Sequence, residues 1–284
     1  MKTVIWLFLY VFSFYLYAQS PMDAATLAYH MGQYDKVKSI LKKEGHKGNL
    51  QAQLDLAALY KDGIGLKQSY ENAFFWYKKA ASKDAQAAYE IAQMYEKGEG
   101  VDKNITAAIQ WYSKAASQEN MSAYFRLGEF YYKGIILDKN MTNAMYWYNK
   151  AAEKGNLQAQ YVVGYMYEHA QGVEQNNTKA FAYYLKAAKG GYVDAIYNVA
   201  TYYYVGKDIA QNYQEAISWY EKAASKEDAQ AQYNLGLIYF KGEGVPKNKI
   251  ITFQYWMQAA KNSHLKAQEA LDKLCKESPW ACKE

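Results

Sequence analysis

Few residues of this chain are spaced for covalent chemistry. A serine three residues before a lysine, the start of one kind of serine acyl-transfer site, occurs at Ser39–Lys42 and at Ser263–Lys266. The chain is rich in lysine, so such pairs are expected by chance. The Ser-Asp-Asn and Lys-Thr-Gly motifs that complete this kind of site do not occur in the 284 residues. We therefore predict that the protein is not an enzyme and has no catalytic residues.

Metal and cofactor sites are not indicated either. Neither His-Glu-x-x-His nor Cys-x-x-Cys occurs, and the histidines are far apart in the sequence. They are His30, His46, His169 and His264. Gly-x-Gly recurs along the chain, but no strand pattern precedes it, so we interpret it as a helix stop and not as a nucleotide-binding loop. We expect no metal and no cofactor.

Cys275 and Cys282 are the only cysteines. If the chain is exported to an oxidising compartment, we expect them to form a disulfide that holds the C-terminal tail. Two free thiols are the alternative.

The basic residues argue against a nucleic-acid partner. The formal net charge is +5, yet Arg126 is the one arginine among 33 basic residues. Arginine is the side chain preferred for bidentate recognition of phosphate and guanine.

The N-terminus resembles a targeting segment. Val4 to Tyr17 is almost wholly apolar, too short for a bilayer span of roughly 20 residues but suited to a signal peptide. We predict a signal peptide over 1–18, cleaved after Ala18, and a periplasmic or secreted bacterial protein with no stable membrane insertion after cleavage. Because Leu16 stands where a small residue is usual, an uncleaved segment that tethers the protein to the membrane is the alternative.

A repeated unit dominates the rest of the sequence. The pattern Trp-Tyr-x-Lys-Ala-Ala recurs at intervals of 35 or 36 residues. The six copies begin at Trp76, Trp111, Trp147, Tyr183, Trp219 and Tyr255, the fourth and sixth being variants. Self-similarity at this period is typical of repeat proteins built from helix hairpins.

A second pattern precedes each copy. It starts at a repeat alanine, followed by an aliphatic residue at +4, a small residue at +5 and a tyrosine at +8. This spacing is one face of a helix. The six alanines are Ala52, Ala87, Ala123, Ala159, Ala195 and Ala231. Glycine within a helix costs roughly 1 kcal/mol relative to alanine, so small residues at +5 indicate a close approach by a neighbouring helix.

Turns and caps divide each repeat into two helices. Glycine pairs such as Gly63 and Gly65 end the first helix, and a good N-cap residue begins the second. The six predicted N-caps are Ser69, Asn104, Asn140, Asn176, Asn212 and Asn248. First helices are predicted near 50–61, 86–97, 121–133, 157–169, 193–205 and 229–241. Second helices are predicted near 69–82, 104–117, 140–154, 176–189, 212–225 and 248–261. Three of the asparagines also start Asn-x-Thr sequons, which we interpret as caps.

One such hairpin cannot bury its apolar faces, so the hairpins must stack. We predict an N-terminal capping hairpin over 19–48, opened by a capping box at Ser20 to Asp23. Six repeats then occupy 49–262. A C-terminal capping helix and tail occupy 263–284.

The repeat resembles the Sel-one-like repeat family, a relative of the tetratricopeptide repeat. The resemblance covers roughly 49–275 and is carried by Ala-x-x-x-Leu-Gly-x-x-Tyr, Gly-x-Gly-Val and Ala-x-x-Trp-Tyr-x-Lys-Ala-Ala. Three turn positions depart from it, with Ala170, Ile136 and Asp208 in place of glycine. The resemblance implies an all-α fold, a right-handed α-solenoid of antiparallel helix hairpins.

The same resemblance implies a function. It implies a non-catalytic scaffold that binds another protein through its concave face. Two alternatives come from exported members of the family. One is an effector-immunity or host-factor-binding protein, and the other is the penicillin-binding or β-lactamase-like activity linked to cysteine-rich members.

Candidate contact residues lie on the first helices. Positions +3, +6 and +10 after the repeat alanine share a stripe but vary among repeats, which leaves them freer to serve recognition. We predict an anchor patch rich in tyrosine, a residue enriched at interfaces, with one polar contact from arginine. Its members are Arg126, Tyr132, Val162, Tyr165, Tyr204 and Val205. The alternative is that these side chains pack between repeats. We expect a monomer whose partner is another protein.

Overall fold

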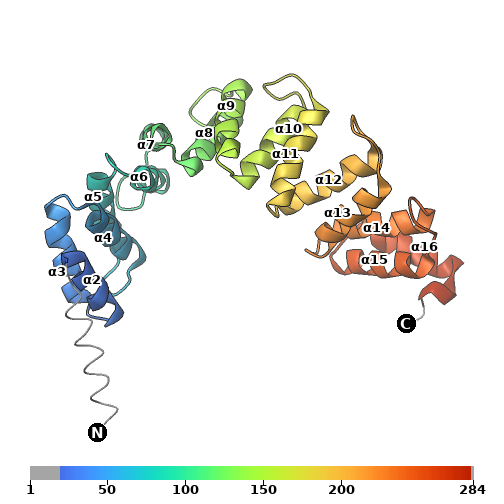
Figure 1. Ribbon diagram of the computed structural model, residues 1–284, viewed down its shortest axis with the longest axis horizontal. Coiled ribbons are helices and arrows are strands. Elements are labelled where there is room, and N and C mark those ends of the chain that lie inside the picture. Colours follow the sequence, from blue (N-terminus) through green and yellow to red (C-terminus); the bar gives the residue numbers. More distant parts are fainter. Residues whose placement is uncertain (1–19, 283–284) are drawn as a thin grey trace, which may run out of the picture. The chain divides into compact units, whose positions relative to one another are not determined.

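The computed structural model describes residues 20–282, and the regular elements in this range are all helices (Figure 1). The predicted signal peptide lies outside the described residues. The first helices of the six repeats are α4 (Leu50–Asp62), α6 (Ala85–Lys97), α8 (Met121–Lys133), α10 (Leu157–Glu168), α12 (Val193–Val205) and α14 (Ala229–Lys241). The second helices are α5 (Tyr70–Ala80), α7 (Ile105–Ser117), α9 (Met141–Glu153), α11 (Asn177–Lys189), α13 (Tyr213–Ala224) and α15 (Lys249–Lys261).

Further helices lie at both ends of this array. α2 (Pro21–His30) and α3 (Tyr34–His46) form a hairpin before the first repeat. α16 (Leu265–Glu277) and the 3-10 helix η1 (Pro279–Cys282) follow the last one. None of the helices between residues 20 and 282 is long and apolar enough to cross a membrane.

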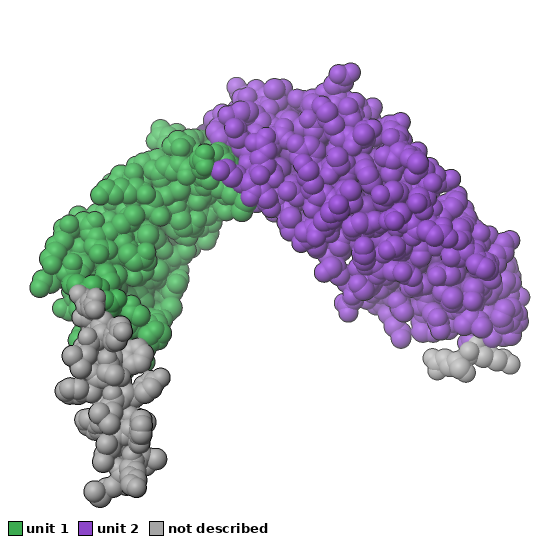
Figure 2. Space-filling view, in the orientation of Figure 1, with its two compact units in different colours: residues 1–127 green, residues 128–284 purple. Residues whose placement is uncertain are grey.

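The chain divides into two compact units, residues 1–127 and residues 128–284 (Figure 2). In each unit, consecutive helices pack as hairpins and each hairpin packs on the next, as α10 with α11 and α11 with α12. This is the all-α solenoid architecture that the repeat predicts.

The predicted caps are confirmed. At each of the six positions the Ser or Asn side chain accepts a hydrogen bond from a backbone N–H in the first turn. The capping box is also present, because Ser20 Oγ accepts from the Asp23 N–H while the Asp23 carboxylate accepts from the Ser20 N–H. Caps outside the repeat signature begin five of the first helices, at Asn49, Asp84, Asn120, Asn156 and Asp228. Local sequence therefore sets where these helices begin.

The three turns that lack a glycine keep the geometry of the others. Ile136, Ala170 and Asp208 have φ angles of 63°, 53° and 54°, in the left-handed region that favours glycine. Glycines at the matching positions of other repeats, such as Gly98 and Gly244, have φ angles of 80° and 72°. The departures from the repeat pattern therefore change the side chain and not the turn.

A buried aromatic ring from the second helix recurs in the core, among buried alanines and aliphatic side chains. Tyr112, Tyr184 and Tyr220 are at most 1% exposed, and Trp256 is 4% exposed. The ring lies on the small residue at +5 of the first helix, so that a Cβ at Gly164 would stand 2.8 Å from Tyr184 Cδ1. The predicted close approach is therefore made by a side chain lying on the first helix.

Gly236→Ala tests this contact, because its two effects oppose each other. Because alanine is a better helix former than glycine, the substitution should stabilise the helix by about 1 kcal/mol. A Cβ at this position would overlap the Trp256 indole, which should cost about 1–3 kcal/mol and lower the melting temperature. Gln230→Ala, at an exposed position of the same helix, should change stability by less than about 0.5 kcal/mol. A Gly236→Ala protein that is as stable as the wild type or more so would contradict the packing described.

Candidate protein interface

Position +3 of the first helices joins successive repeats. In the first unit Lys61 Nζ donates to Glu90 Oε2 at 2.7 Å, linking α4 to α6. In the second unit the Asn234 amide of α14 donates to the hydroxyls of Tyr197 and Tyr220, at 3.3 Å and 3.2 Å. Part of the variable stripe is therefore structural, which is the alternative that the sequence left open.

Arg126, the predicted polar contact, belongs to such a link. Its guanidinium forms an ion pair with Glu96 of the preceding repeat, and Glu96 also accepts a hydrogen bond from the Tyr112 hydroxyl at 2.6 Å. The Arg126 side chain is 26% exposed. Arg126 therefore neutralises the carboxylate that accepts the hydrogen bond from the buried Tyr112 hydroxyl.

Glu168 occupies the matching position in the second unit. It accepts from the Tyr184 hydroxyl at 2.9 Å and from Lys207 Nζ at 3.1 Å. Burial acts to raise the pKa of Glu168, but the hydrogen bonds from Tyr184 and Lys207 outweigh it, so the pKa lies below its ordinary value. Burial, together with the charge on Glu168, raises the pKa of Tyr184.

Tyr132 and Tyr204, both at position +9, pack on the second-helix tyrosine of their own repeats. The Tyr132 ring lies 6.3 Å from that of Tyr148, and the Tyr204 ring lies 6.4 Å from that of Tyr220. The Tyr204 hydroxyl also donates to Glu243 at 2.6 Å. Both tyrosines are half-buried, so each has a structural contact whatever else it binds.

The remaining predicted residues are at least partly accessible, although Tyr165 also packs against the hydrophobic core of the second unit. Val162 and Tyr165 are half-buried on one face of α10, and the Tyr165 ring lies 4.2 Å from the ring of His169, which is exposed. We call Val162, Tyr165 and His169 the α10 patch. Val205 is 57% exposed at the end of α12, in the next repeat. Val162 and Tyr165 therefore lie on α10, with His169 directly after its last residue.

The predicted repeat signature omits an aromatic residue that recurs two positions after the repeat alanine. Position +2 is aromatic in five repeats, and its ring packs on the buried ring of the second helix. The centroid distances are 5.4 Å for Tyr89–Tyr112, 5.5 Å for Tyr161–Tyr184, 5.7 Å for Tyr197–Tyr220 and 6.2 Å for Tyr233–Trp256. Aligning the repeats on their alanine would have revealed it.

The residues considered for acyl transfer are separate from these contacts. Ser39 lies on α3 and Ser263 lies between α15 and α16, and both are exposed. Neither hydroxyl is hydrogen-bonded to a lysine within the described residues, although an activated nucleophile needs a base within reach. No group of three or more His, Cys, Asp or Glu residues in this part of the chain could hold a metal ion.

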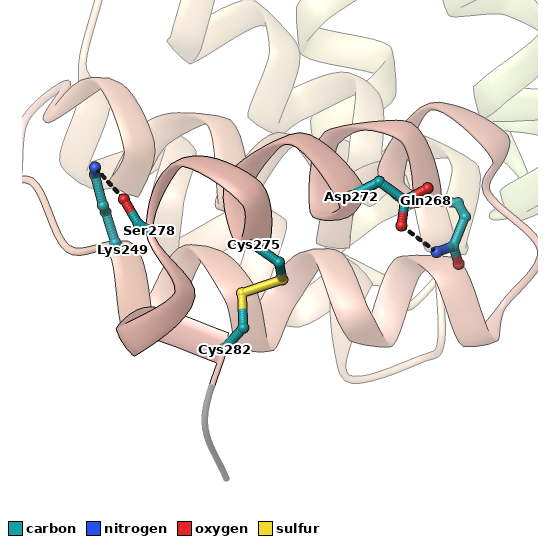
Figure 3. The surroundings of a disulfide bond; sticks show 6 residues. All are labelled: Lys249, Gln268, Asp272, Cys275, Ser278 and Cys282. Atoms are coloured by element: carbon teal, nitrogen blue, oxygen red, sulfur yellow. Dashed lines mark hydrogen bonds between the residues drawn. A yellow bond between two sulfur atoms is a disulfide. The ribbon is translucent and has the colours of Figure 1, made fainter.

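A disulfide closes the C-terminal end. Cys275 of α16 is bonded to Cys282 of η1, with Cα atoms 5.7 Å apart (Figure 3). Between them, the buried Ser278 accepts a hydrogen bond from Lys249 Nζ of α15 at 2.7 Å. Together these bonds hold the tail against the last repeat, as the two cysteines predict.

Comparison with known proteins identifies the repeat. The Sel1 repeat profile matches six consecutive segments, residues 50–84, 85–120, 122–156, 157–192, 193–228 and 229–264. A protective antigen from uropathogenic Escherichia coli that displays an SLR fold is 27% identical, with a TM-score of 0.84 over 92% of this chain. This chain spans 58% of that antigen. No curated protein matches the sequence.

Two further solved structures resemble this chain to different degrees. A Sel1 repeat protein from Oxalobacter formigenes is 30% identical, with a TM-score of 0.67 over 84% of this chain and 98% of its own. An immunity protein from Pseudomonas aeruginosa is 22% identical, with a TM-score of 0.40 over 76% of this chain and 82% of its own. The second similarity is too low to carry an argument about function.

Glu168→Gln tests the link between the fourth and fifth repeats through its pH dependence. A carboxylate with a depressed folded-state pKa stabilises the fold above its unfolded value, about 4.5, and the stabilisation is lost as the pH falls through the folded value. The variant should therefore be less stable than wild type by about 1 kcal/mol at pH 7, with the difference shrinking towards pH 3. Melting curves between these pH values measure it. The exposed Glu174→Gln should show no such trend, and a pH-independent difference for Glu168→Gln would refute the assignment.

Proposed function

This chain belongs to the Sel1 repeat family, whose members act as protein-interaction scaffolds, and from that premise we propose that it is a non-catalytic scaffold that binds another protein through the α10 patch. The predicted patch also included Tyr132, Tyr204, Val205 and Arg126. Because the Arg126 guanidinium is paired with Glu96 and the Tyr204 hydroxyl is bonded to Glu243, we place the centre of binding on α10.

The observation that carries the proposal is the contrast between two faces of α10. Val163 and Met166 are fully buried, whereas Val162, Tyr165 and His169 on the next face are partly or largely accessible. In the following repeat, the residue that matches Tyr165 is Thr201, and it is hydrogen-bonded to Tyr220 at 3.0 Å. At this position α10 therefore presents an aromatic ring where the next repeat has a polar side chain that is already hydrogen-bonded. Tyrosine is among the residues enriched at the energetic centres of protein interfaces.

Photo-crosslinking tests where a partner docks. A photoreactive residue in place of Tyr165 should crosslink one dominant protein from the producing cell or its secreted fraction, and a photoreactive residue in place of Tyr146 should not. Tyr146 is a suitable control because it is 54% exposed on a second helix, α9. Tyr165→Ala should weaken binding of that protein at least tenfold while leaving the melting temperature within a few degrees of wild type. Equal crosslinking from both positions, or a large loss of helicity in Tyr165→Ala, would instead assign Tyr165 to nonspecific contact or to the core.

We propose further that the protein works outside the cytoplasm, in the periplasm or the medium. The Cys275–Cys282 disulfide supports this location, because such bonds persist in oxidising compartments and are rare in the cytosol. The predicted signal peptide is consistent with it.

Alkylation of thiols in freshly lysed cells tests the location. Both cysteines should resist alkylation unless a reductant is added first, and the protein should be found in the periplasmic or secreted fraction. Cys275→Ser, which leaves one thiol free, provides the positive control for alkylation. Rapid alkylation of both wild-type cysteines without a reductant would place the protein in a reducing compartment.

A further inference from the structure

A groove of about 320 Å³ lies in the first unit, between the N-terminal hairpin and α4. Val37, Leu41 and Leu59 form its floor and are 2%, 2% and 8% exposed. Tyr29 and Ile64 stand at its sides and are 38% and 41% exposed. The groove is therefore an apolar hollow that is open at the surface of the first unit.

The groove exists because the N-terminal hairpin is short. The N-caps of α2 and α3, Ser20 and Gln33, are 13 residues apart, whereas those of α4 and α5, Asn49 and Ser69, are 20 apart. The N-terminal hairpin thus lacks the last turn of a full first helix and the glycine turn that follows it. In the full repeats, that last turn carries the residue that meets position +3 of the next first helix, as Lys61 meets Glu90. Opposite α4 no such turn is present, and the surface of α4 stays open.

Two carboxylates line this open surface. Asp55, at the same repeat position as Glu90, accepts a hydrogen bond from Gln51 of its own helix at 2.7 Å. Asp62, one turn beyond Ala58, is exposed, and its charge helps to raise the pKa of the adjacent Lys61. The described residues that line the groove include no lysine, arginine or histidine. The side chains that line the groove therefore offer apolar surface and two carboxylates, with no basic group among them.

We propose that this groove binds a segment of a partner protein that carries an apolar side chain next to a lysine or arginine. The apolar side chain would cover Leu41 and Leu59, and the cation would pair with Asp55 or Asp62. A neutral or acidic segment would cover the carboxylates without a counter-charge, and the loss of their hydration would oppose binding. Arginine fits best, because its guanidinium can bond a carboxylate through two N–H groups. None of these residues belongs to the α10 patch, so the proposal stands or falls independently of the function proposed above.

A random peptide library displayed on phage, selected on the immobilised full chain, tests the chemistry of the groove. Selection should discard phage that also bind Ala58→Trp, in which an indole fills the groove beside Leu59. The enriched peptides should place Leu, Ile, Phe or Met within two positions of Lys or Arg. A synthetic copy should lose at least tenfold in affinity for the Asp55→Asn/Asp62→Asn double variant, and its affinity should fall as salt is raised.

Asp102→Asn is the matched control, because Asp102 is an exposed aspartate in the turn region of the second repeat, and it should leave the affinity unchanged. Peptides without a basic residue, or with equal affinity for the double asparagine variant, would overturn the proposal. So would peptides that bind Ala58→Trp but lose affinity for Tyr165→Ala, since these would dock on the α10 patch. Sedimentation can also show whether the wild type self-associates. If it does, and Ala58→Trp abolishes the self-association, the occupant of the groove is a second copy of the chain and the proposal is overturned.

Discussion

The burial of aromatic rings from the second helices is the constraint on which the repeats depend. In the second unit, the rings of Tyr148, Tyr184 and Trp256 lie against the glycine at +5 of the first helix. Close packing allows little else there, so the sequence must keep glycine or alanine at +5 even though glycine weakens a helix. The tyrosine hydroxyl must then find a hydrogen-bond partner, because a buried phenol without one is costly.

That second requirement explains the polar residues of the first helices. The Tyr112 hydroxyl donates to Glu96 and the Tyr184 hydroxyl donates to Glu168, which brings a carboxylate to these two junctions between repeats. A partly buried carboxylate is stabilised by a cation, and the next repeat supplies Arg126 or Lys207. The Tyr220 hydroxyl is satisfied without charge, by Thr201 and Asn234. The links between repeats thus differ in chemistry, although each provides a hydrogen-bond partner for a buried tyrosine hydroxyl.

This variety explains what the sequence can and cannot predict. Helix limits, caps and turns follow from local rules that recur in each repeat, and even Ile136 and Asp208 keep the turn of the glycines they replace. The partners of position +3 change from Lys61 to Glu96 and to Tyr197, so this position varies as a binding surface would. The contacts that Arg126 and Tyr204 make with neighbouring repeats therefore could not be predicted from the sequence. The position of an aromatic residue at +2 was visible in the sequence, but its packing on the buried ring was not.

The two ends of the array meet the need for a cap in different ways. At the C-terminal end, α16 covers the Trp256 cluster, and the disulfide and the Lys249–Ser278 hydrogen bond hold the following turn in place. At the N-terminal end, α3 packs on α4, but the hairpin leaves Leu59, Asp55 and Asp62 lining an open groove. Asp55 and Asp62 belong to α4 and not to the cap, so the short hairpin accounts for the open groove, while recognition of a partner there is our proposal.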